Sequence, residues 1–456
     1  MNKISFAEIK SYLPQNTKFS FKEISSIIEG NIGRIIKKNV SFLNGKFPIG
    51  FWNYTDLEKH SKIYNLSEIK KWADAGFTIV HGPDFKPDDK KQKQLMIKIL
   101  NWCNKYGIKV ILWDPRCIVK NNINISKYKK EVKKSIFDFG KLPALFGFFL
   151  CDEPGYNLME DVVKSVRIQR EIEPKLIPFV NLLPFFKGVE GRIGTTDWIG
   201  FLEDYIEKSN TELLSYDCYF QMNPDEEGVK TYFENLRIFR EVSLKKGIPF
   251  WTTLLCVGHF NYRCPNYDEL RWQFNTSLAC GANGILWFFY YMRIPHSNYR
   301  FSPVNELWEL TETYYNLRLI HKNFHQHYRD LFTKLVSRKV FFYPEASGGW
   351  SKFNPKESLI SQISCMPENH PLLIGEFVDI VGRPYIMLVN NSMKENVYCT
   401  ITFTGKNIRV FSWDWDGKEY EGKAYSAILI NRGKENIRVS HWLAPGQEAV
   451  YRVYKK

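Results

Sequence analysis

The sequence predicts an α/β protein in which a (β/α)₈ TIM barrel is followed by a smaller all-β sandwich. From about residue 47, short β-rich runs alternate with amphipathic helical stretches, which is typical of a parallel sheet covered by helices. The alternation repeats eight times, the number that a closed barrel requires. After about residue 330 the pattern changes to short alternating runs with no convincing helix, which indicates a second, all-β domain.

The barrel is predicted to span residues 45–330. Its strands are expected at residues 47–52, 77–82, 108–115, 145–154, 177–184, 213–221, 248–260 and 282–292. Its helices are expected at residues 67–75, 90–106, 127–139, 158–171, 197–208, 229–246, 268–280 and 305–324, where apolar residues recur every three or four positions. Glycines follow four helices shortly before the next strand, as C-terminal caps do: Gly76, Gly107, Gly247 and Gly281. No glycine-rich phosphate-binding motif follows an early strand, so an open nucleotide-binding sheet is disfavoured.

The barrel is expected to be flanked by two further segments. Residues 331–456 form the predicted sandwich, with strands at residues 335–343, 374–377, 386–390, 397–403, 408–412, 427–430 and 448–454. Residues 1–44 form a polar, partly helical lead-in, with a helix at residues 21–38 that is expected to pack outside the barrel. No internal repeat is evident.

Composition limits the partners of the chain. The formal net charge is +14, but the lysines are scattered over predicted helix faces and no basic tract carries interleaved aromatics, so no nucleic-acid partner is expected. Nine cysteines without CxxC spacing indicate free thiols in a reducing compartment. No signal peptide or membrane-spanning run is visible, so a cytoplasmic location is expected, with a removed signal and an extracellular location left open. The oligomeric state is not predicted.

Two adjacent carboxylates, Asp152 and Glu153, follow an almost uncharged apolar strand. The residues just past a barrel strand face the active site, so this placement suits acid/base chemistry. Glycoside hydrolysis needs a proton donor and a second carboxylate. We expect Glu153 to be the donor, with a pKa raised by partial burial, and Asp217 at the end of strand six to be its partner. The alternatives are that Asp152 or Glu153 caps the next helix and that Asp217 forms a structural salt bridge.

Polar and aromatic residues at the other strand ends are candidates for substrate binding. Flat aromatic rings stack on sugars, and amide or imidazole groups bind sugar hydroxyls, although barrel filling is an equally good explanation for each aromatic ring. Asp114 in a WDP sequence also reads as an Asx turn, and a lone histidine on an apolar strand is usually satisfied in the core. The candidates are Trp52, Trp113, Asp114, Asn181, Tyr216, Tyr219, His259, Trp287 and Tyr290.

Metal and nucleophile chemistry find little support. His321 and His325 have i, i+4 spacing, but no HExxH glutamate accompanies them and the segment reads as a solvated helix face. No GxSxG motif occurs, and no cysteine has convincing catalytic partners. The sequence therefore predicts no metal site and no organic cofactor.

Three short motifs resemble the clan A glycoside hydrolases. The phrase NGKFPIGFW at residues 44–52 resembles the first strand of such barrels, and CDEP at residues 151–154 resembles their NEP signature, in which the Glu is the acid/base. The phrase WLAPGQEAVYRV at residues 442–453 looks like the closing strands of the β-sandwich that these enzymes often carry. The resemblance implies a glycosidase acting on an oligosaccharide or glycoside, with Glu153 as acid/base.

The resemblance fails at strand seven. Clan A enzymes place a nucleophilic Glu at its end, whereas residues 248–260 contain no carboxylate. Either Asp217 substitutes, or strand seven lies elsewhere, or the protein is a non-catalytic carbohydrate-binding barrel, so a retaining or inverting mechanism is not assigned. The adjacent Asp-Glu pair and the phrase SYDCY at residues 215–219 are also similar to hexosaminidases and chitinase-like barrels. That similarity implies substrate-assisted hydrolysis in which Asp152 orients an acetamido group and Tyr216 or Asp217 supports it.

Overall fold

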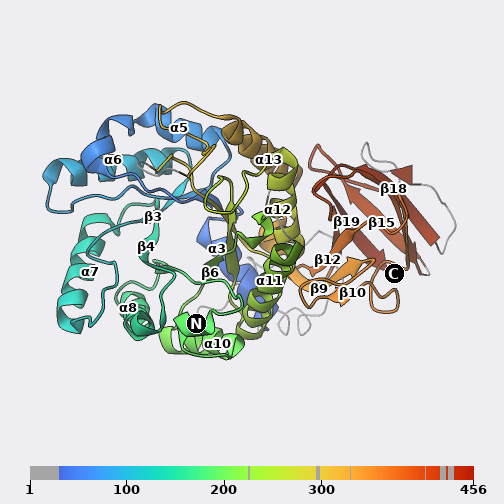
Figure 1. Cartoon of the computed structure of the whole chain (residues 1–456), viewed down its shortest axis with the longest axis horizontal. Helices are drawn as coiled ribbons and strands as arrows, with labels where there is room; N and C mark the ends of the chain where they lie inside the picture. The colour runs from blue at the N-terminus through green and yellow to red at the C-terminus, as the bar shows by residue number, and fades with distance from the viewer. Residues whose placement is uncertain are drawn as a thin grey trace.

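The computed structural model describes residues 30–223, 226–293, 298–328, 330–405, 407–421, 428–429 and 436–455. Figure 1 shows a ring of helices around a set of strands, with a separate group of antiparallel strands beside it. The predicted fold class, a (β/α)₈ barrel followed by a β-sandwich, is confirmed.

The barrel consists of eight parallel strands in two four-stranded sheets, ordered β1-β8-β7-β6 and β2-β3-β4-β5. Hydrogen bonds across both seams, from Thr78 N–H to Ile49 O and from Leu182 N–H to Ser215 O, are each 2.8 Å long and close the ring. Each strand lies inside its predicted range: β1 (Ile49–Phe51), β2 (Ile79–His81), β3 (Lys109–Leu112), β4 (Leu145–Asp152), β5 (Phe179–Asn181), β6 (Leu214–Asp217), β7 (Phe250–Leu255) and β8 (Ile285–Phe288).

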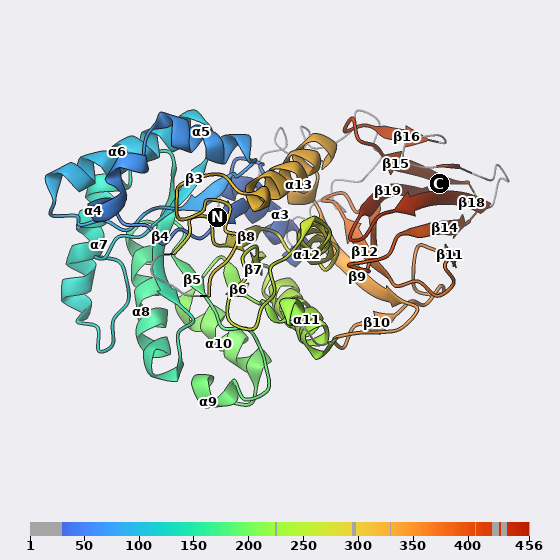
Figure 2. The ribbon, with the colours of Figure 1, turned by 45° about the horizontal axis from the view of Figure 1, so that its top comes forward.

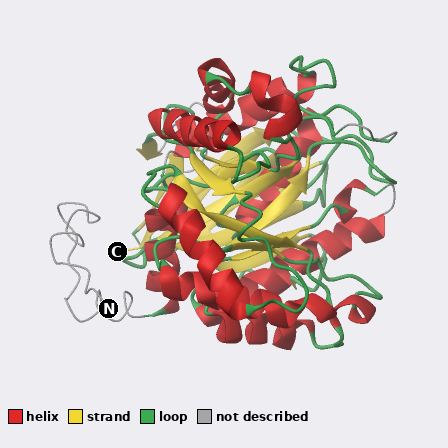
Figure 3. Cartoon of the chain, turned by 90° about the vertical axis from the view of Figure 1, so that its left-hand side faces the viewer, coloured by secondary structure: helices red, strands yellow, loops and turns green. Residues whose placement is uncertain are grey.

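Helices surround this barrel, as Figure 3 shows from the side. They are α5 (Leu66–Asp74), α6 (Lys90–Lys105), α7 (Ile125–Phe139), α8 (Tyr156–Ile172), α10 (Trp198–Ser209), α11 (Glu226–Lys246), α12 (Tyr267–Ala279) and α13 (Glu312–Tyr328). Two short helices, α4 (Leu57–His60) and α9 (Glu190–Ile193), lie in loops after strands. The helix predicted at residues 305–324 begins only at Glu312. The Asn305 side chain accepts hydrogen bonds from the N–H groups of Leu307 and Glu309, which holds a turn there instead.

The lead-in does not lie wholly outside the barrel, which corrects the prediction for residues 1–44. Helix α3 (Asn31–Phe42) ends with the ring of Phe42 packed against Phe146 and Trp251, at centroid distances of 5.5 and 6.1 Å. Those two rings stand near the starts of β4 and β7, so Phe42 closes the amino-terminal end of the barrel. Burying this aromatic side chain stabilises the fold relative to leaving it exposed to water. The part of the predicted helix before residue 30 lies outside the described residues.

The C-terminal part forms two facing sheets, ordered β10-β9-β12-β13-β19-β15-β16 and β11-β14-β18-β17 (Figure 2). The strands are β9 (Val336–Tyr343), β10 (Ser351–Lys352), β11 (Gln362–Met366), β12 (Leu372–Val378), β13 (Pro384–Asn390), β14 (Val397–Thr404), β15 (Ile408–Trp413), β16 (Glu419–Glu421), β17 (Ile428–Leu429), β18 (Asn436–Leu443) and β19 (Glu448–Lys455). Of the run predicted at residues 427–430, only residues 428–429 are described. No helix in the described part of the chain is both long and apolar enough to cross a membrane.

Candidate active site

The carboxyl end of β4 brings Asp152 and Glu153 to the mouth of the barrel. The pairing of β4 with β5 shifts register between Phe149 and Cys151, and such a bulge re-aims the side chains that follow it. Glu153 has a φ of 44°, a left-handed conformation that is uncommon for a residue other than glycine and that concentrates at functional sites. Its N–H group donates to Asn181 O at 2.8 Å, which holds the backbone in this conformation.

Asn181, the last residue of β5, connects two carboxylates. Its side-chain Nδ2 donates to Asp152 Oδ1 at 3.0 Å and to Asp217 Oδ1 at 2.7 Å. Asn181 and Asp217 are buried, whereas Asp152 lies at the mouth and meets solvent. One oxygen of each carboxylate thus lies within 3.0 Å of the same nitrogen. Three consecutive strands, β4, β5 and β6, supply the residues of this cluster.

The three carboxyl groups of this cluster have raised pKa values. Burial, reinforced by the negative charges of Glu153 and Asp152, raises the pKa of Asp217 well above its usual range. Desolvation by the surrounding protein raises the pKa of Asp152 to about 6. The hydrogen bond from Asn181 opposes this rise, and the negative charge of Glu153 adds to it. Burial also raises the pKa of Glu153, against the opposing charge of Arg192. The cluster therefore retains protons at pH values where isolated carboxyl groups are ionised, as sites of acid/base chemistry do.

Two arginines that the sequence analysis did not single out flank the carboxylates. Arg192, in α9, places Nη2 3.4 Å from Glu153 Oε2. Arg293, beyond the end of β8, lies with its guanidinium carbon 4.0 Å from the centre of the Tyr54 ring. Both positive charges oppose the rise in the pKa of Asp152. The signal available in the sequence was their position beyond strand carboxyl ends, but neither forms a recognisable motif.

Trp113, Tyr219 and His259 lie at or just below the mouth of the barrel. Trp113 is partly exposed and stacks on Phe149 at a centroid distance of 4.2 Å. The half-buried Tyr219 hydrogen-bonds Asp217 and lies beside Phe288, at 5.2 Å between ring centroids. His259 is buried 5.8 Å from the Tyr219 ring. Trp113 and Tyr219 are therefore placed where a ligand can reach them, whereas the buried His259 packs beside Tyr219.

Three of the predicted stacking residues are buried in the core, which corrects their assignment. Trp52 is 1% exposed and its Nε1–H donates to Thr253 Oγ1 at 3.1 Å. Trp287 and Tyr290 are fully buried, Trp287 donating to the ring of His321. A sugar cannot stack on rings that no solvent reaches: Trp52 packs inside the barrel, whereas Trp287 and Tyr290 pack against residues of α13, His321 and Tyr314.

Asp114 and Tyr216 also have structural places, contrary to their predicted binding roles. The fully buried Asp114 carboxylate is held by the guanidinium of Arg116, which also bonds Asp138. Tyr216 stacks on Phe239 of α11 at 3.8 Å, because successive residues of β6 point to opposite faces and Asp217 takes the inner one. Tyr216 is thus unable to support a substrate acetamido group, and Tyr219 is the tyrosine nearest the cluster's Asp217.

His321 lies in the core rather than on a solvated helix face. Its Nε2 accepts a hydrogen bond from Trp287 Nε1 at 2.9 Å, so its Nδ1 donates to Ala75 O at 2.8 Å. Burial lowers its pKa to about 3. Both ring nitrogens are engaged, and among the described residues no group of three or more His, Cys, Asp or Glu side chains is placed to hold a metal ion.

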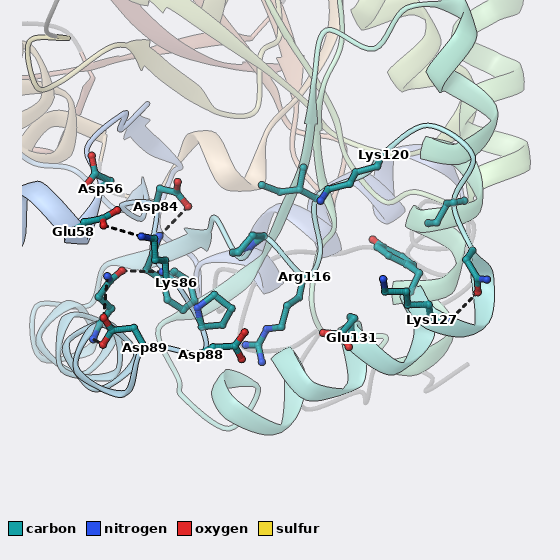
Figure 4. A pocket seen from close by; sticks show the side chains of 18 of the residues that line it. Asp56, Glu58, Asp84, Lys86, Asp88, Asp89, Arg116, Lys120, Lys127 and Glu131 are labelled. Atoms are coloured by element: carbon teal, nitrogen blue, oxygen red, sulfur yellow. Dashed lines mark hydrogen bonds and ion pairs between the residues drawn. The ribbon is translucent and has the colours of Figure 1, made fainter.

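A groove of about 850 Å³ adjoins the barrel mouth and is formed by loops that follow β1, β2 and β3 (Figure 4). Lys86 bonds Glu58 across its wall at 2.7 Å, and burial raises the pKa of Asp84. Other acidic and basic side chains also line the groove: Asp56, Asp88, Asp89, Arg116, Lys120, Lys127 and Glu131. The groove lining thus carries both acidic and basic side chains.

Several solved glycoside hydrolases have a similar fold. A family 5 glycoside hydrolase from Bacteroides vulgatus superposes with a TM-score of 0.52 at 14% identity, over 90% of this chain and 89% of its own. A family 39 enzyme from Bacteroides cellulosilyticus gives 0.50 at 11% identity, over 90% and 82%. A β-galactosidase from Marinomonas ef1 gives 0.46 at 12% identity, and the chain spans 59% of that protein's length. No family model and no curated protein matches the sequence. The likeness shows that this chain shares the fold of the family 5 and family 39 glycoside hydrolases.

Proposed function

We propose that the protein is a glycosidase that cleaves O-glycosidic bonds with Glu153 as proton donor and Asp217 as the second carboxylate. The observation that carries this proposal is the carboxylate cluster, in which Asp152 and Asp217 share the amide of Asn181 beside Glu153. Raised pKa values within a barrel mouth are what a proton-donating carboxyl requires. The glycoside hydrolase-like fold supports the same chemistry.

The reaction would begin with Glu153 protonated. Glu153 gives its proton to the bridging oxygen as the glycosidic bond breaks, and Arg192, 3.4 Å away, stabilises the carboxylate that remains. Burial holds a proton on Asp217 in the absence of substrate; this proton leaves to solvent before the bond breaks, and the ionised carboxylate then stabilises the positive charge that develops on the sugar in the transition state. Water finally supplies the proton to Glu153 and the hydroxyl to the sugar.

The test is a panel of aryl glycosides and oligosaccharides assayed with wild type, Glu153→Gln and Asp217→Asn. We expect wild-type turnover of at least one member and loss in both variants, with ligand binding intact. Proton NMR of the first product then shows whether the anomeric configuration is retained or inverted. Retention is expected where the two catalytic carboxyl groups act about 5–5.5 Å apart, and inversion where they act about 6.5–9.5 Å apart. Binding of a glycan without turnover by wild type would identify a non-catalytic carbohydrate-binding barrel instead.

A substrate-assisted mechanism is the second candidate, because residues 250–263, which contain β7 and its loop, have no Asp or Glu. In that scheme Glu153 remains the donor and Asp152 orients a substrate acetamido group. It predicts turnover confined to N-acetylhexosaminides and competitive inhibition by a thiazoline analogue. Turnover of glycosides that lack the acetamido group would exclude it.

A further inference from the structure

Arg293 is a cation held in a fixed place at the mouth of the barrel. Its guanidinium lies over the Tyr54 ring at 4.0 Å and near the Tyr299 ring at 5.4 Å, and Nη1 donates to the Tyr299 hydroxyl at 3.0 Å. Aromatic faces orient a guanidinium without neutralising its charge. The side chain is therefore preorganised, and within the described ranges the hydrogen bond recorded for its guanidinium is the one to Tyr299.

The described carboxylates nearest to Arg293 form no ion pair with it. In the part of the chain that the structure describes, no carboxylate oxygen lies within 4.0 Å of the Arg293 guanidinium. Arg293 is nevertheless close enough to Asp152 to oppose the rise in its pKa. This arrangement differs from that of Arg192, which contacts Glu153, and of Arg116, which grips Asp114 through several hydrogen bonds. Among the described residues, Arg293 therefore acts on Asp152 through its charge and forms no ion pair with the reactive cluster.

We propose that Arg293 binds an anionic substituent of the substrate, a uronate carboxylate or a sulfate ester, and so selects acidic glycans. This inference rests on the proposed function of the same site. A guanidinium matches planar and tetrahedral oxyanions with paired N–H···O bonds. An acidic sugar entering a mouth that holds three carboxyl groups needs such a counter-charge, whereas a neutral sugar does not.

A basic flank of the barrel adjoins the rim groove. A second hollow shares Pro87, Asp88 and Arg116 with the rim groove and runs along α7, where Lys129, Lys130, Lys133 and Lys134 line it. The chain as a whole carries a net charge of +14. Such a field raises the local concentration and the association rate of an acidic ligand.

The test compares binding of acidic oligosaccharides with that of their neutralised counterparts by isothermal titration calorimetry. The uronate arm uses oligogalacturonate, hyaluronan and alginate oligomers with their methyl esters, and the sulfate arm uses carrageenan oligomers with desulfated ones. We expect an acidic member of one arm to bind best, and Arg293→Gln to weaken it by about tenfold to a hundredfold. Neutralised ligands should bind wild type and Arg293→Gln equally, and Arg293→Lys should retain part of the affinity. The matched control, Arg318→Gln, changes an exposed arginine on α13 and should alter nothing.

Three results would overturn the inference: failure of every acidic oligosaccharide to bind wild type, equal loss of acidic and neutral ligands in Arg293→Gln, or turnover of neutral glycosides with no preference for acidic ones. Equal loss would make Arg293 a structural counter-charge for Asp152. Circular dichroism of each variant confirms that it is folded. Binding without turnover by wild type would contradict the proposed hydrolysis and leave the inference standing. Turnover of neutral glycosides with no preference for acidic ones would support the proposed hydrolysis and contradict the inference.

Discussion

The raised pKa of Asp217 makes the stability of the folded protein depend on pH. Its pKa is raised well above the usual range by burial and by the charges of Glu153 and Asp152. Above the ordinary carboxyl pKa of about 3.9, the unfolded chain releases this proton while the folded protein keeps it. The folded state then binds more protons, so stability falls as pH rises from about 4 toward the raised pKa, and the contribution is constant below that window.

Asp217→Asn should remove this pH-dependent loss. The side-chain oxygen of the introduced amide still accepts the hydrogen bond from Asn181, and no charge is buried, so we expect the variant to be more stable than wild type by on the order of 1–3 kcal/mol at pH 7. The difference should vanish near pH 4. Urea unfolding at a series of pH values measures it. Asp204→Asn, on the exposed face of α10, is the control and should shift stability by at most about 0.5 kcal/mol. A variant that is less stable at pH 7 would contradict the assignment.

Glu153→Gln tests proton donation separately from folding. Gln keeps the size of the side chain but has no proton to transfer, so kcat for unactivated glycosides should fall about 10²–10⁴-fold. Aryl glycosides with good leaving groups need less protonation and should lose much less. Steady-state kinetics on both substrate types measure the contrast, with Glu160→Gln on the exposed side of α8 as control. An equal loss on both types would show that Glu153 does not act as the acid.

At the scale of single elements, Gly147 lets β4 and β5 approach. A Cβ built on Gly147 would lie 1.9 Å from Ile177 O, which no rotamer change can relieve because the backbone fixes the Cβ position and Ile177 O is itself a backbone atom. Gly147→Ala should therefore destabilise the protein by about 1–3 kcal/mol or more and shift the strand that ends at Asp152. Thermal unfolding and activity should both decline. Gly191→Ala is the control, since a Cβ there meets nothing within 4 Å; equal effects of the two substitutions would refute this account.

The sequence allowed the order of the barrel elements to be predicted because helix and strand periods differ and glycines mark the junctions. It did not reveal which residues at the strand ends face a ligand. Barrel strands of three or four residues are buried on both sides, so Trp52 and Tyr216 show no alternation that would place them. The cluster around Asp152, Glu153 and Asp217 was predictable because charged residues stand out after apolar runs.

The arginines were harder to foresee, for a reason that belongs to the whole molecule. Arg293 gains its place from Tyr54 after β1 and from Tyr299 beyond β8, which become neighbours only when the barrel closes. Phe42 likewise gained its buried place from two strands far along the chain. Such long-range contacts leave no local pattern, whereas a carboxylate after an apolar strand does.

The barrel and the sandwich meet along α12 and α13, and we propose a boundary near residue 330, between α13 and β9. Glu448, at the start of β19, accepts hydrogen bonds from Tyr328 Oη at 3.0 Å and from Asn275 Nδ2 at 2.5 Å. A Cβ on Gly375 of β12 would lie 2.3 Å from Ala279 O, so the sandwich is in direct contact with the end of α12 (Figure 2). Close packing and buried polar contacts of this kind couple the unfolding of two domains.

We therefore expect wild type to unfold in one calorimetric transition whose van't Hoff and calorimetric enthalpies agree. Glu448→Ala takes this acceptor from two buried donors, at a cost of about 1–3 kcal/mol each, all of it at the interface. The single transition should then broaden or divide, with the sandwich and the barrel melting apart. Glu345→Ala removes an exposed ion pair with Lys352 within the sandwich and should leave the transition single. Two transitions in wild type, or an undivided one in Glu448→Ala at unchanged temperature, would show that this contact does not join the domains.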